Sequence, residues 1–459
     1  MAQTYDAIII GTGQSGPSLA GRLTGAGMNV AVVERHLFGG TCVNVGCIPT
    51  KTLVASARAA YMARRGADFG VMIDGDITVD MKKVKARKDE LVRASNSGVE
   101  NWLKTMKNCT VFEGHGRFEG PRTVGVGDDL LESDQIFINV GARASVPPIP
   151  GIESVNYMTN TQIMEVDFLP EHLLVLGGSY IGLEFGQMYR RFGSEVTVVQ
   201  RDEHLLSRED EDVSLAVKEI IESEGVTVCT DTGDFTIEKR GERISIQMMC
   251  SGAPREVEGS HLLVATGRKP NTDDLGLDKA GVEADGRGYI QVDDELKTNV
   301  PGIWAIGDCN GKGAFTHTSY NDFEIVAANL LDGDPRRVSD RIMAYALYID
   351  PPLARVGMTE RQVRDSGRKA LVALKPMAHI GRAKEKSETH GFMKFLVDAE
   401  TKEFLGATIL GVGGDEIIHC VLDVMYAKAP YTMISRAMHI HPTVAELIPT
   451  TLQELKPLE

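Results

Sequence analysis

Two segments of the chain repeat one order of strand, glycine turn, helix and strand, and this repeat constrains the fold more than any other feature. The first, residues 5–35, reads YDAIIIGTGQSGPSLAGRLTGAGMNVAVVER. The second, residues 172–201, reads HLLVLGGSYIGLEFGQMYRRFGSEVTVVQR. In each, a short apolar run precedes the glycines and another follows the helical stretch, as in a βαβ unit. Two such units in 459 residues predict a multidomain α/β protein with two Rossmann-like dinucleotide-binding domains.

The first repeat carries a complete dinucleotide fingerprint. Gly11, Gly13 and Gly16 fit G-x-G-x-x-G, which allows a tight turn, close approach of the backbone to a pyrophosphate and close packing of helix on strand. Glu34 ends the second strand, 18 residues after Gly16. A carboxylate there accepts hydrogen bonds from ribose hydroxyls, so this repeat predicts a dinucleotide site.

The second repeat departs from the fingerprint at the middle glycine. Gly177 and Gly182 hold the first and third positions, but Ser179 occupies the second. Its Cβ would crowd a pyrophosphate slightly, while its hydroxyl can donate a hydrogen bond. A modified nucleotide site is therefore expected.

The acidic position is also changed in the second repeat, where Gln200 stands in place of a carboxylate and Arg201 follows it. Without the carboxylate a 2′-phosphate is not repelled, and Arg201 together with Arg208 can pair with it. This favours NADPH over NADH. The alternative is that both arginines are ordinary solvated charges.

A close pair of cysteines, Cys42 and Cys47, lies in GGTCVNVGCIPTK at residues 39–51. Pro49 fits the first turn of a helix, so both sulfurs are expected near a helix N-terminus, which lowers a thiol pKa. The alternatives are two small buried hydrophobes or a structural metal site. A closed metal site needs about four ligands, however, and only His36 lies near in sequence. We therefore predict a redox pair and no metal site.

This cysteine loop resembles the active-site signature of the flavin-dependent pyridine nucleotide-disulfide oxidoreductases, the family of dihydrolipoamide dehydrogenase, glutathione reductase and mercuric reductase. The resemblance extends over nearly the whole chain in six ordered segments. It implies two Rossmann-like domains, for FAD and NAD(P), and a C-terminal α+β dimerisation domain. The expected order is the first part of the FAD domain at 1–145, the NAD(P) domain at 146–264, the second part of the FAD or central domain at 265–340 and the dimer-interface domain at 341–459.

Further segments resemble cofactor-binding motifs of the family. IFINVGARASVPPIPGI at 136–152 and LLVATGRKPN at 262–271 are similar to the two crossovers between the FAD and NAD(P) domains. In GIWAIGDCNG, the resemblance assigns Asp308 to the ribityl chain, and the following helix to the flavin ring, where its positive end favours the reduced anion. The other positions assigned to cofactor binding are Gly40, Thr41, Gly141, Tyr180, Ile181, Gly267, Gly307, Thr316 and His317.

The resemblance also implies catalytic roles. Cys47 would face the flavin, and Cys42 would attack the substrate. Lys51 and Glu184 match residues that pair beside the flavin, where the cation stabilises incoming negative charge. Without the resemblance, Lys51 is interpreted as a surface lysine and Glu184 as an acid on a helix face.

A second catalytic element is expected in HIHPTVAELIP near residue 441. His441 and Glu446 match the family's His-Pro-Thr…Glu element, in which a carboxylate orients an imidazole that acts as acid and base for the thiols. In relatives it reaches the cysteines of the partner subunit, which implies a homodimer with a shared active site. The alternative is a helix start with Pro442 at its first position and the histidine as a passive cap. His439 is predicted to be structural.

Cysteine usage and charge limit the possible partners and compartment. The cysteines outside the pair are isolated from one another in sequence and are predicted to pack in the interior: Cys109, Cys229, Cys250, Cys309 and Cys420. The formal charge of −15 disfavours nucleic acid and anionic membranes. No apolar run reaches the ~18 residues of a membrane span, and no basic flank precedes AIII. The expected location is the cytoplasm.

The expected substrate is a small disulfide or lipoyl-type compound. Mercuric reductases have vicinal C-terminal cysteines and generally lack the His-Pro-Thr…Glu element, whereas here the last cysteine is Cys420 and the element is present. One alternative is a mercuric-reductase-like enzyme that reduces a metal ion or an oxidant. Another is a low-turnover flavoprotein subunit or redox sensor in a larger complex.

Overall fold

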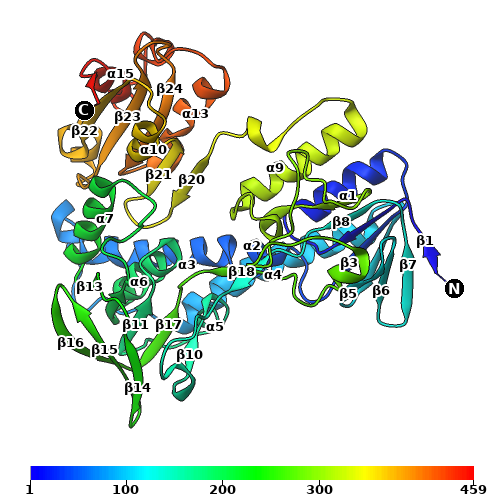
Figure 1. Ribbon diagram of the computed structural model, residues 1–459. Helices are drawn as coiled ribbons and strands as arrows, with labels where there is room; N and C mark the ends of the chain where they lie inside the picture. The colour runs from blue at the N-terminus through cyan, green and yellow to red at the C-terminus, as the bar shows by residue number, and fades with distance from the viewer. Residues whose placement is uncertain (1, 459) are drawn as a thin grey trace.

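The computed structural model describes residues 2–458 and has the predicted α/β class, built as three lobes (Figure 1). The first lobe contains a five-stranded parallel sheet in the order β19-β8-β2-β3-β4. Its strands come from two distant stretches of chain. They are β19 (Ile303–Ala305), β8 (Ile136–Ile138), β2 (Ala7–Ile10), β3 (Val30–Glu34) and β4 (Cys109–Glu113).

Both faces of this sheet are covered. Helices α1 (Ser15–Gly25) and α9 (Thr316–Ala327) pack on the face that presents Ile9 and Val32. The opposite face presents Ile8 and Val33 to a small second sheet. The strands of that sheet are β1 (Gln3–Thr4), β7 (Asp129–Glu132), β6 (Thr123–Val126) and β5 (Gly116–Gly120). Because alternate residues point to opposite faces, continuous apolar strands are needed here, and β2 and β3 have them.

The second lobe repeats the architecture with the order β10-β17-β11-β12-β13, again all parallel. Its strands are β10 (Tyr157–Met158), β17 (His261–Val264), β11 (His172–Leu176), β12 (Glu195–Val199) and β13 (Thr227–Cys229). Helices α6 (Tyr180–Phe192) and α7 (Glu211–Ser223) pack on one face. An antiparallel sheet covers the other, formed by β14 (Thr236–Arg240), β15 (Arg243–Cys250) and β16 (Ala253–Gly259).

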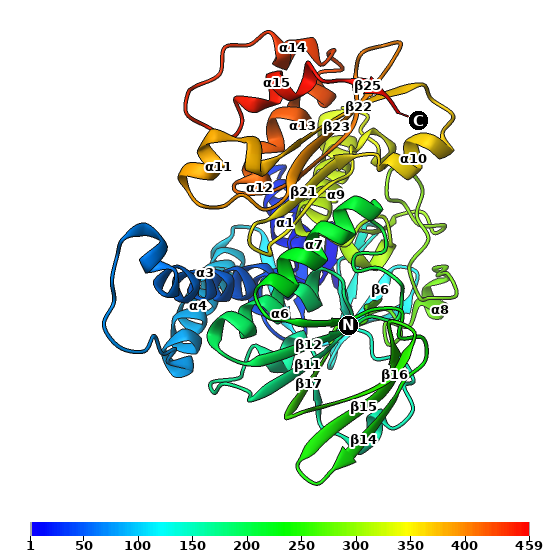
Figure 2. The ribbon, with the colours of Figure 1, turned by 90° about the vertical axis from the view of Figure 1, so that its left-hand side faces the viewer.

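The third lobe is an antiparallel sheet in the order β20-β21-β24-β23-β22-β25, which lies above the other two lobes in Figure 2. Its strands are β20 (Ala344–Leu347), β21 (Leu353–Gly357), β24 (Phe404–Leu410), β23 (Phe392–Asp398), β22 (Ala370–Pro376) and β25 (Lys456–Pro457). Its helices are α10 (Glu360–Asp365), α11 (Gly381–Glu385), α12 (Gly414–Ile417), α13 (His419–Tyr426), α14 (Thr432–Ser435) and α15 (Leu447–Leu452). Much of the sheet's apolar surface packs against these helices.

The long helix α3 (Cys47–Arg64) joins the lobes. Leu53 and Ala57 of α3 belong to the same core cluster as Leu183 and Phe185 of α6, and this cluster also includes Leu353 of the third lobe. The other α-helices and strands of the chain are α2 (Gly40–Asn44), α4 (Met81–Thr105), α5 (Asn160–Ile163), α8 (Leu277–Ala280), β9 (Ala142–Ala144) and β18 (Arg268–Pro270). Within residues 2–458, no helix is long and apolar enough to cross a membrane.

Both predicted βαβ units form as expected, with strand, turn, helix and strand in β2-α1-β3 and β11-α6-β12. The cysteine segment follows the prediction at Pro49, which lies in the first turn of α3, but it contains one helix more than expected. Cys42 lies inside the short helix α2, and only Cys47 begins the following helix α3. Gly39 at φ 89° precedes α2 and Gly46 precedes α3. The segment therefore folds as a short helix followed by the start of the long helix α3, rather than as one loop.

Candidate active site

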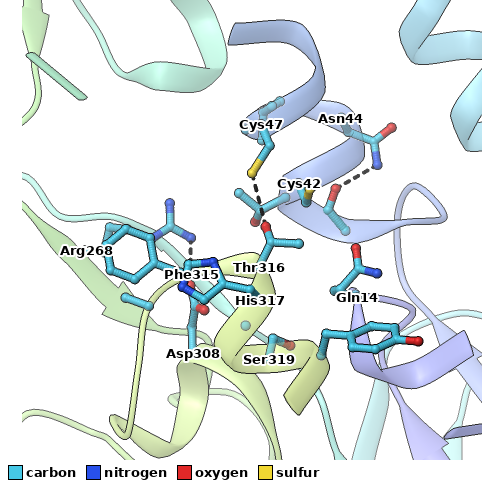
Figure 3. A pocket seen from close by; sticks show the side chains of 18 of the residues that line it. Gln14, Cys42, Asn44, Cys47, Arg268, Asp308, Phe315, Thr316, His317 and Ser319 are labelled. Carbon is cyan, nitrogen blue, oxygen red and sulfur yellow. Dashed lines mark hydrogen bonds and ion pairs between the residues drawn. The ribbon is translucent and has the colours of Figure 1, made fainter. Parts of the chain in front are cut away.

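A cavity of about 1080 Å³ runs between the first βαβ turn, the cysteine segment and the start of α9. Figure 3 shows Cys42 and Cys47 on one wall, with Thr316, His317 and Asp308 facing them. The cavity brings together many of the residues that the sequence pointed to. They are Gly11, Gly13, Glu34, Gly40, Thr41, Cys42, Cys47, Lys51, Gly141, Tyr180, Ile181, Glu184, Asp308, Thr316 and His317.

The three glycines of the first turn meet different steric requirements. A Cβ on Gly11 would lie 2.3 Å from the Asn139 carbonyl oxygen, and one on Gly16 would lie 2.4 Å from the Gly11 carbonyl oxygen. A Cβ on Gly13 would meet nothing closer than 3.5 Å. The protein itself therefore requires Gly11 and Gly16, whereas Gly13 leaves open space on the cavity wall. That space fits the close approach of a pyrophosphate to the backbone.

Glu34 is held in a fixed orientation at the end of β3. Its carboxylate accepts hydrogen bonds from the Thr12 amide at 2.9 Å, the Thr12 hydroxyl at 2.5 Å and the His36 amide at 2.9 Å. The side chain is buried except where it lines the cavity. Sequence reasoning found Glu34 but missed Thr12 and His36, because a threonine between two glycines and a histidine after a strand carry no signal of this contact.

The two cysteines are free thiols in different protonation environments. Hydrogen bonding to Cys42 and to Thr316, whose Oγ1 lies 3.0 Å from the sulfur, outweighs burial and lowers the pKa of Cys47 from 9.0 to about 6. The positive charge of Lys51 acts in the same direction. The same interaction raises the pKa of Cys42, together with burial. The pair therefore shares one negative charge near neutral pH, and it rests mainly on Cys47.

The reduced protein should be alkylated at Cys47 with a midpoint near pH 6, because the thiolate is the reacting species and is present above that pH. Mass spectrometry after short iodoacetamide pulses from pH 4.5 to 9.5 measures this directly. Thr316→Val and Lys51→Met should each move the midpoint upward, since each removes a group that stabilises the thiolate. A wild-type midpoint above pH 8 would contradict this assignment of the charge.

Lys51 and Glu184 form an ion pair between α3 and α6. The Lys51 ammonium lies 2.8 and 2.9 Å from the two Glu184 oxygens and 4.5 Å from the ring centre of Tyr348. Glu184 also accepts a hydrogen bond from the Tyr348 amide at 2.9 Å and is only 4% exposed. This pair brings a cation and its counter-charge to the cavity wall beside Cys47. Tyr348 was not found from the sequence, since a single tyrosine after a strand is not a motif.

Of the glycines predicted at the GIWAIGDCNG segment and the two crossovers, Gly141 lines the cavity, whereas Gly267 and Gly307 do not. Asp308 lies in the cavity wall 3.4 Å from the Arg268 guanidinium, and burial raises the pKa of its carboxyl. Gly307 has φ 76°, and a Cβ there would lie 2.8 Å from the Ser319 hydroxyl. Gly141 and Gly267 also have positive φ but have open space at the Cβ position. At the start of α9, the His317 Nε2 atom lies 2.7 Å from the Ala344 carbonyl oxygen, which accepts a hydrogen bond from it.

The second βαβ turn lies in its own lobe, outside this cavity except for Tyr180 and Ile181. Added Cβ atoms would clash with backbone at Gly177, 2.5 Å from the Ala265 oxygen, and at Gly182, 1.9 Å from the Gly177 oxygen. Ser179 is exposed just before α6 and caps no helix amide with its side chain. The turn thus keeps the two glycines that the backbone requires.

The acidic position of the second unit is occupied by Gln200, whose side chain is already engaged. Its Oε1 accepts a hydrogen bond from the Gly178 amide at 2.8 Å, and its Nε2 donates to Asp202 at 3.1 Å. Arg201 is 75% exposed and lies 3.7 Å from Asp202. Arg208 is also exposed. An accessible pair of arginines therefore lies beside this turn, with one carboxylate close by.

His441 lies outside the cavity, on the surface of the third lobe. Its Nδ1 is 3.0 and 3.1 Å from the two oxygens of Glu446, and its side chain is 83% exposed in the single chain. Glu446 also accepts a hydrogen bond from the Thr443 amide at 3.1 Å. Met438 and Ile440 beside it are almost fully exposed. The imidazole is thus oriented by a carboxylate. It is not among the residues that line the cavity around Cys42 of its own chain.

The remaining cysteines only partly follow the packing prediction. Cys229, Cys250 and Cys309 are buried, and Cys109 is half-buried. The prediction is wrong for Cys420, which is exposed on α13 because it lies on the helix face away from the sheet core. Among residues 2–458, no group of three or more His, Cys, Asp or Glu side chains is arranged to hold a metal ion.

Comparison with protein-family models gives two adjoining matches. Residues 5–322 match the pyridine nucleotide-disulphide oxidoreductase model, and residues 343–452 match the dimerisation domain of the same family. Among curated proteins, the chain is 37% identical over 455 residues to the probable pyridine nucleotide-disulfide oxidoreductase RclA of Escherichia coli, with 96% of this chain and 97% of that protein covered. It is 33% identical to a dihydrolipoyl dehydrogenase of Cupriavidus necator, with 98% and 97% covered.

A mercuric reductase of Bacillus cereus is 31% identical, with 95% of this chain and 70% of that protein covered. Among solved structures, the HOCl-induced flavoprotein disulfide reductase RclA from Escherichia coli superimposes with a TM-score of 0.88 at 35% identity, covering 98% of this chain and 99% of that one. Its Cu(II) complex gives a TM-score of 0.89, with 99% and 100% covered. Because matches of this identity extend along nearly the full length, the chain belongs to the pyridine nucleotide-disulfide oxidoreductase family.

Proposed function

We propose that this protein is an FAD-dependent NAD(P)H:disulfide oxidoreductase that uses Cys42 and Cys47 to reduce a small disulfide or lipoyl-type substrate. The observation that carries the proposal is the position of both cysteines in the cavity wall, with the Thr316 hydroxyl 3.0 Å from the Cys47 sulfur. The lowered pKa of Cys47 and the raised pKa of Cys42 agree with it. In such a pair one sulfur attacks the substrate, and the other rests as the thiolate that then closes the disulfide.

The residues of the cavity fit a bound FAD, the flavin cofactor used in this family. The open space at Gly13 suits the pyrophosphate, Glu34 the ribose hydroxyls and Asp308 the ribityl chain. Bound FAD supplies two-electron transfer between the nicotinamide and the cysteines. Thr316 and the start of α9 orient the Cys47 sulfur toward this site, and Lys51 adds positive charge beside it.

The proposed thiol chemistry balances with two electrons and two protons. The Cys42 sulfur loses its proton to a base and attacks one sulfur of the substrate disulfide, which forms a mixed disulfide and releases the first substrate thiol. The Cys47 thiolate then attacks the Cys42 sulfur, which closes the Cys42–Cys47 disulfide and releases the second substrate thiol. The base returns the Cys42 proton to one departing sulfur, and the other departing sulfur takes its proton from solvent, because the Cys47 thiolate carries none. The substrate is reduced, and the cysteine pair is oxidised.

The proposed acid and base for these proton transfers is His441 of the partner subunit. A histidine held by Glu446 keeps one tautomer and can both accept and return a proton near neutral pH. His441 is exposed beside Met438 and Ile440, so a second subunit can cover this surface. The match to the family's dimerisation domain supports a homodimer. The proposed compartment is the cytoplasm, where the scattered cysteines stay reduced.

The proposed electron donor is NADPH rather than NADH. The absence of a carboxylate at position 200 and the exposed Arg201 and Arg208 support pairing with a 2′-phosphate. Asp202 opposes it by competing for Arg201. The preference for NADPH therefore requires that Arg201 exchange Asp202 for the 2′-phosphate.

The double variant Gln200→Glu with Arg201→Met should shift the ratio of kcat/KM for NADPH and NADH toward NADH by roughly tenfold or more. This is the change expected when about 1.4 kcal/mol of charged phosphate contact is lost. Steady-state kinetics with both nucleotides gives the ratio. Arg240→Met, which removes an exposed arginine elsewhere in the same lobe, is the matched control. An unchanged ratio in the double variant would refute the 2′-phosphate site.

The substrate class is tested by a turnover screen of the purified protein. NADH and NADPH are each combined with lipoamide, oxidised glutathione, Hg(II) and Cu(II). Steady nucleotide oxidation with a disulfide is expected. Absence of turnover with every acceptor would instead favour a redox sensor or a flavoprotein subunit of a larger complex.

A second candidate function is the reduction of a metal ion at the same thiols. Relatives named mercuric reductase and the Cu(II) complex of Escherichia coli RclA support it, and His419 joins the two cysteines in the lining of the cavity. Metal-ion reduction needs no proton delivery to a leaving thiol. His441→Gln should therefore spare metal-ion turnover while lowering disulfide turnover, which separates the two functions.

A further inference from the structure

A second pair of thiols lies in the second lobe, far from the first in sequence. Cys229 ends β13, and Cys250 ends β15, yet both belong to the same core cluster. The Arg255 Nη1 atom lies 3.5 Å from the Cys229 sulfur and 3.7 Å from the Cys250 sulfur. Each thiol also shifts the pKa of the other, that of Cys229 upward and that of Cys250 downward. Two cysteines separated by 21 positions are thus brought together under one guanidinium.

The two thiols differ in the way that an attacking and a resolving cysteine differ. Burial disfavours the Cys250 thiolate, but hydrogen bonds from Cys229 and Arg255 outweigh it and lower the pKa of Cys250. Burial and the neighbouring Cys250 raise the pKa of Cys229 to about 12. Cys229 is fully buried, whereas Cys250 is 8% exposed and precedes an exposed two-residue turn, Ser251–Gly252. The more acidic thiol is therefore also the one nearer to solvent.

This pair adjoins the second βαβ turn. The Cys229 carbonyl oxygen accepts a hydrogen bond from the Gln200 amide at 2.8 Å, and Cys229 is paired in register with Val199. The Gln200 side chain in turn accepts from the Gly178 amide. One backbone hydrogen bond thus links Cys229 to the residue at the expected ribose position.

We propose that Cys229 and Cys250 are a second redox-active pair, closed to a disulfide by hydroperoxides, and that closure weakens binding of the nicotinamide nucleotide. The second half rests on the proposal that residues 177–201 bind the nucleotide. A disulfide replaces the contacts of both sulfurs with Arg255 and ties the end of β13 to the β15–β16 hairpin. The position of Gln200 then changes with the redox state.

The chemistry proceeds in two balanced steps. The Cys250 thiolate attacks the terminal oxygen of a hydroperoxide, whose O–O bond breaks, giving a sulfenic acid at Cys250 and an alcohol. The Cys229 sulfur then attacks the Cys250 sulfur, the S–O bond breaks, and water leaves with the Cys229 proton. The two thiols lose two electrons and two protons in total, and the hydroperoxide is reduced to alcohol and water. A dithiol reduces the Cys229–Cys250 disulfide back to two thiols by exchange and is itself oxidised to a disulfide.

The test uses the full-length protein carrying Cys42→Ser and Cys47→Ser, so that the first pair does not consume the oxidant. After limited treatment with hydrogen peroxide and alkylation of free thiols, non-reducing peptide mapping should give a crosslink between the peptides of Cys229 and Cys250, which dithiothreitol removes. Adding Cys250→Ser should abolish the crosslink. Arg255→Gln should slow it roughly 3- to 10-fold through loss of thiolate, while Arg240→Gln, at a neighbouring exposed arginine, should not.

The same protein is then titrated with NADPH before and after oxidation. The expected result is weaker binding by the oxidised form, restored by dithiothreitol and absent in Cys229→Ala. Oxidation of Cys250 to sulfinic acid without a crosslink, or two unreacted thiols while the exposed Cys420 is oxidised, would overturn the redox pair. A crosslink with unchanged NADPH affinity would overturn the regulatory half. Failure of the reduced protein to bind NADPH would instead count against the proposed function.

Discussion

Replacing His441 with glutamine should lower disulfide turnover by roughly 10² to 10⁴-fold, the range expected when a positioned acid-base group is lost. Glutamine keeps a polar side chain of similar size but cannot accept and return a proton. Reduction of the flavin by NADPH does not use this proton transfer and should stay nearly intact. Stopped-flow measurement of flavin bleaching beside steady-state disulfide turnover separates the two half-reactions.

The chain offers a matched control for this prediction. His439 is two residues away, and within residues 2–458 its side chain hydrogen-bonds to the Ala437 carbonyl oxygen and forms no ion pair with an acidic residue. His439→Gln should leave turnover at the wild-type level. Glu446→Gln should show an intermediate loss, because it removes the group that orients the imidazole rather than the imidazole itself. Equal losses in the His439 and His441 variants would indicate a structural effect of this surface segment.

Replacing either active-site cysteine with serine should reduce disulfide turnover to background, but the two variants should differ in their absorption spectra. Cys47→Ser removes the residue that carries the thiolate, so no long-wavelength absorption from a thiolate beside the flavin should appear on two-electron reduction. Cys42→Ser leaves Cys47 unpaired, so this absorption should be present without reductant. The intensity of this absorption should increase with pH, since the Cys47 thiolate forms above its pKa. Identical spectra for the two variants would contradict the roles assigned to Cys42 and Cys47.

Much of the fold follows from local sequence patterns. The apolar runs AIII and NVAVV become β2 and β3 with α1 between them, and the second unit forms β11, α6 and β12, because both patterns are local and are buried on two faces. The positive φ values of Gly11 and Gly177 follow from the same turns. These are short-range requirements of the backbone, and a single sequence contains them.

Contacts between distant segments were not predictable in the same way. Tyr348 lies over Lys51, and Thr316 reaches the Cys47 sulfur, although 297 and 269 positions separate them. The proximity of Cys229 and Cys250 depends on how the hairpin of β15 and β16 packs on β13. No periodicity or motif specifies such packing. The resemblance to the family supplied Lys51, Glu184 and His441, whereas residues outside its motifs became visible only in three dimensions.

Disulfide reduction at a site shared between subunits is tested most directly by one complementation measurement. Cys42→Ser subunits with one affinity tag are mixed with His441→Gln subunits carrying another, and heterodimers with both tags are isolated after exchange. Each heterodimer then has one site that combines an intact Cys42 with an intact His441 from the other subunit. The doubly tagged heterodimer should recover about half of wild-type disulfide turnover, since one of two symmetric sites is restored. Isolated heterodimers that still reduce their flavin with NADPH but show no disulfide turnover would contradict a site shared between subunits.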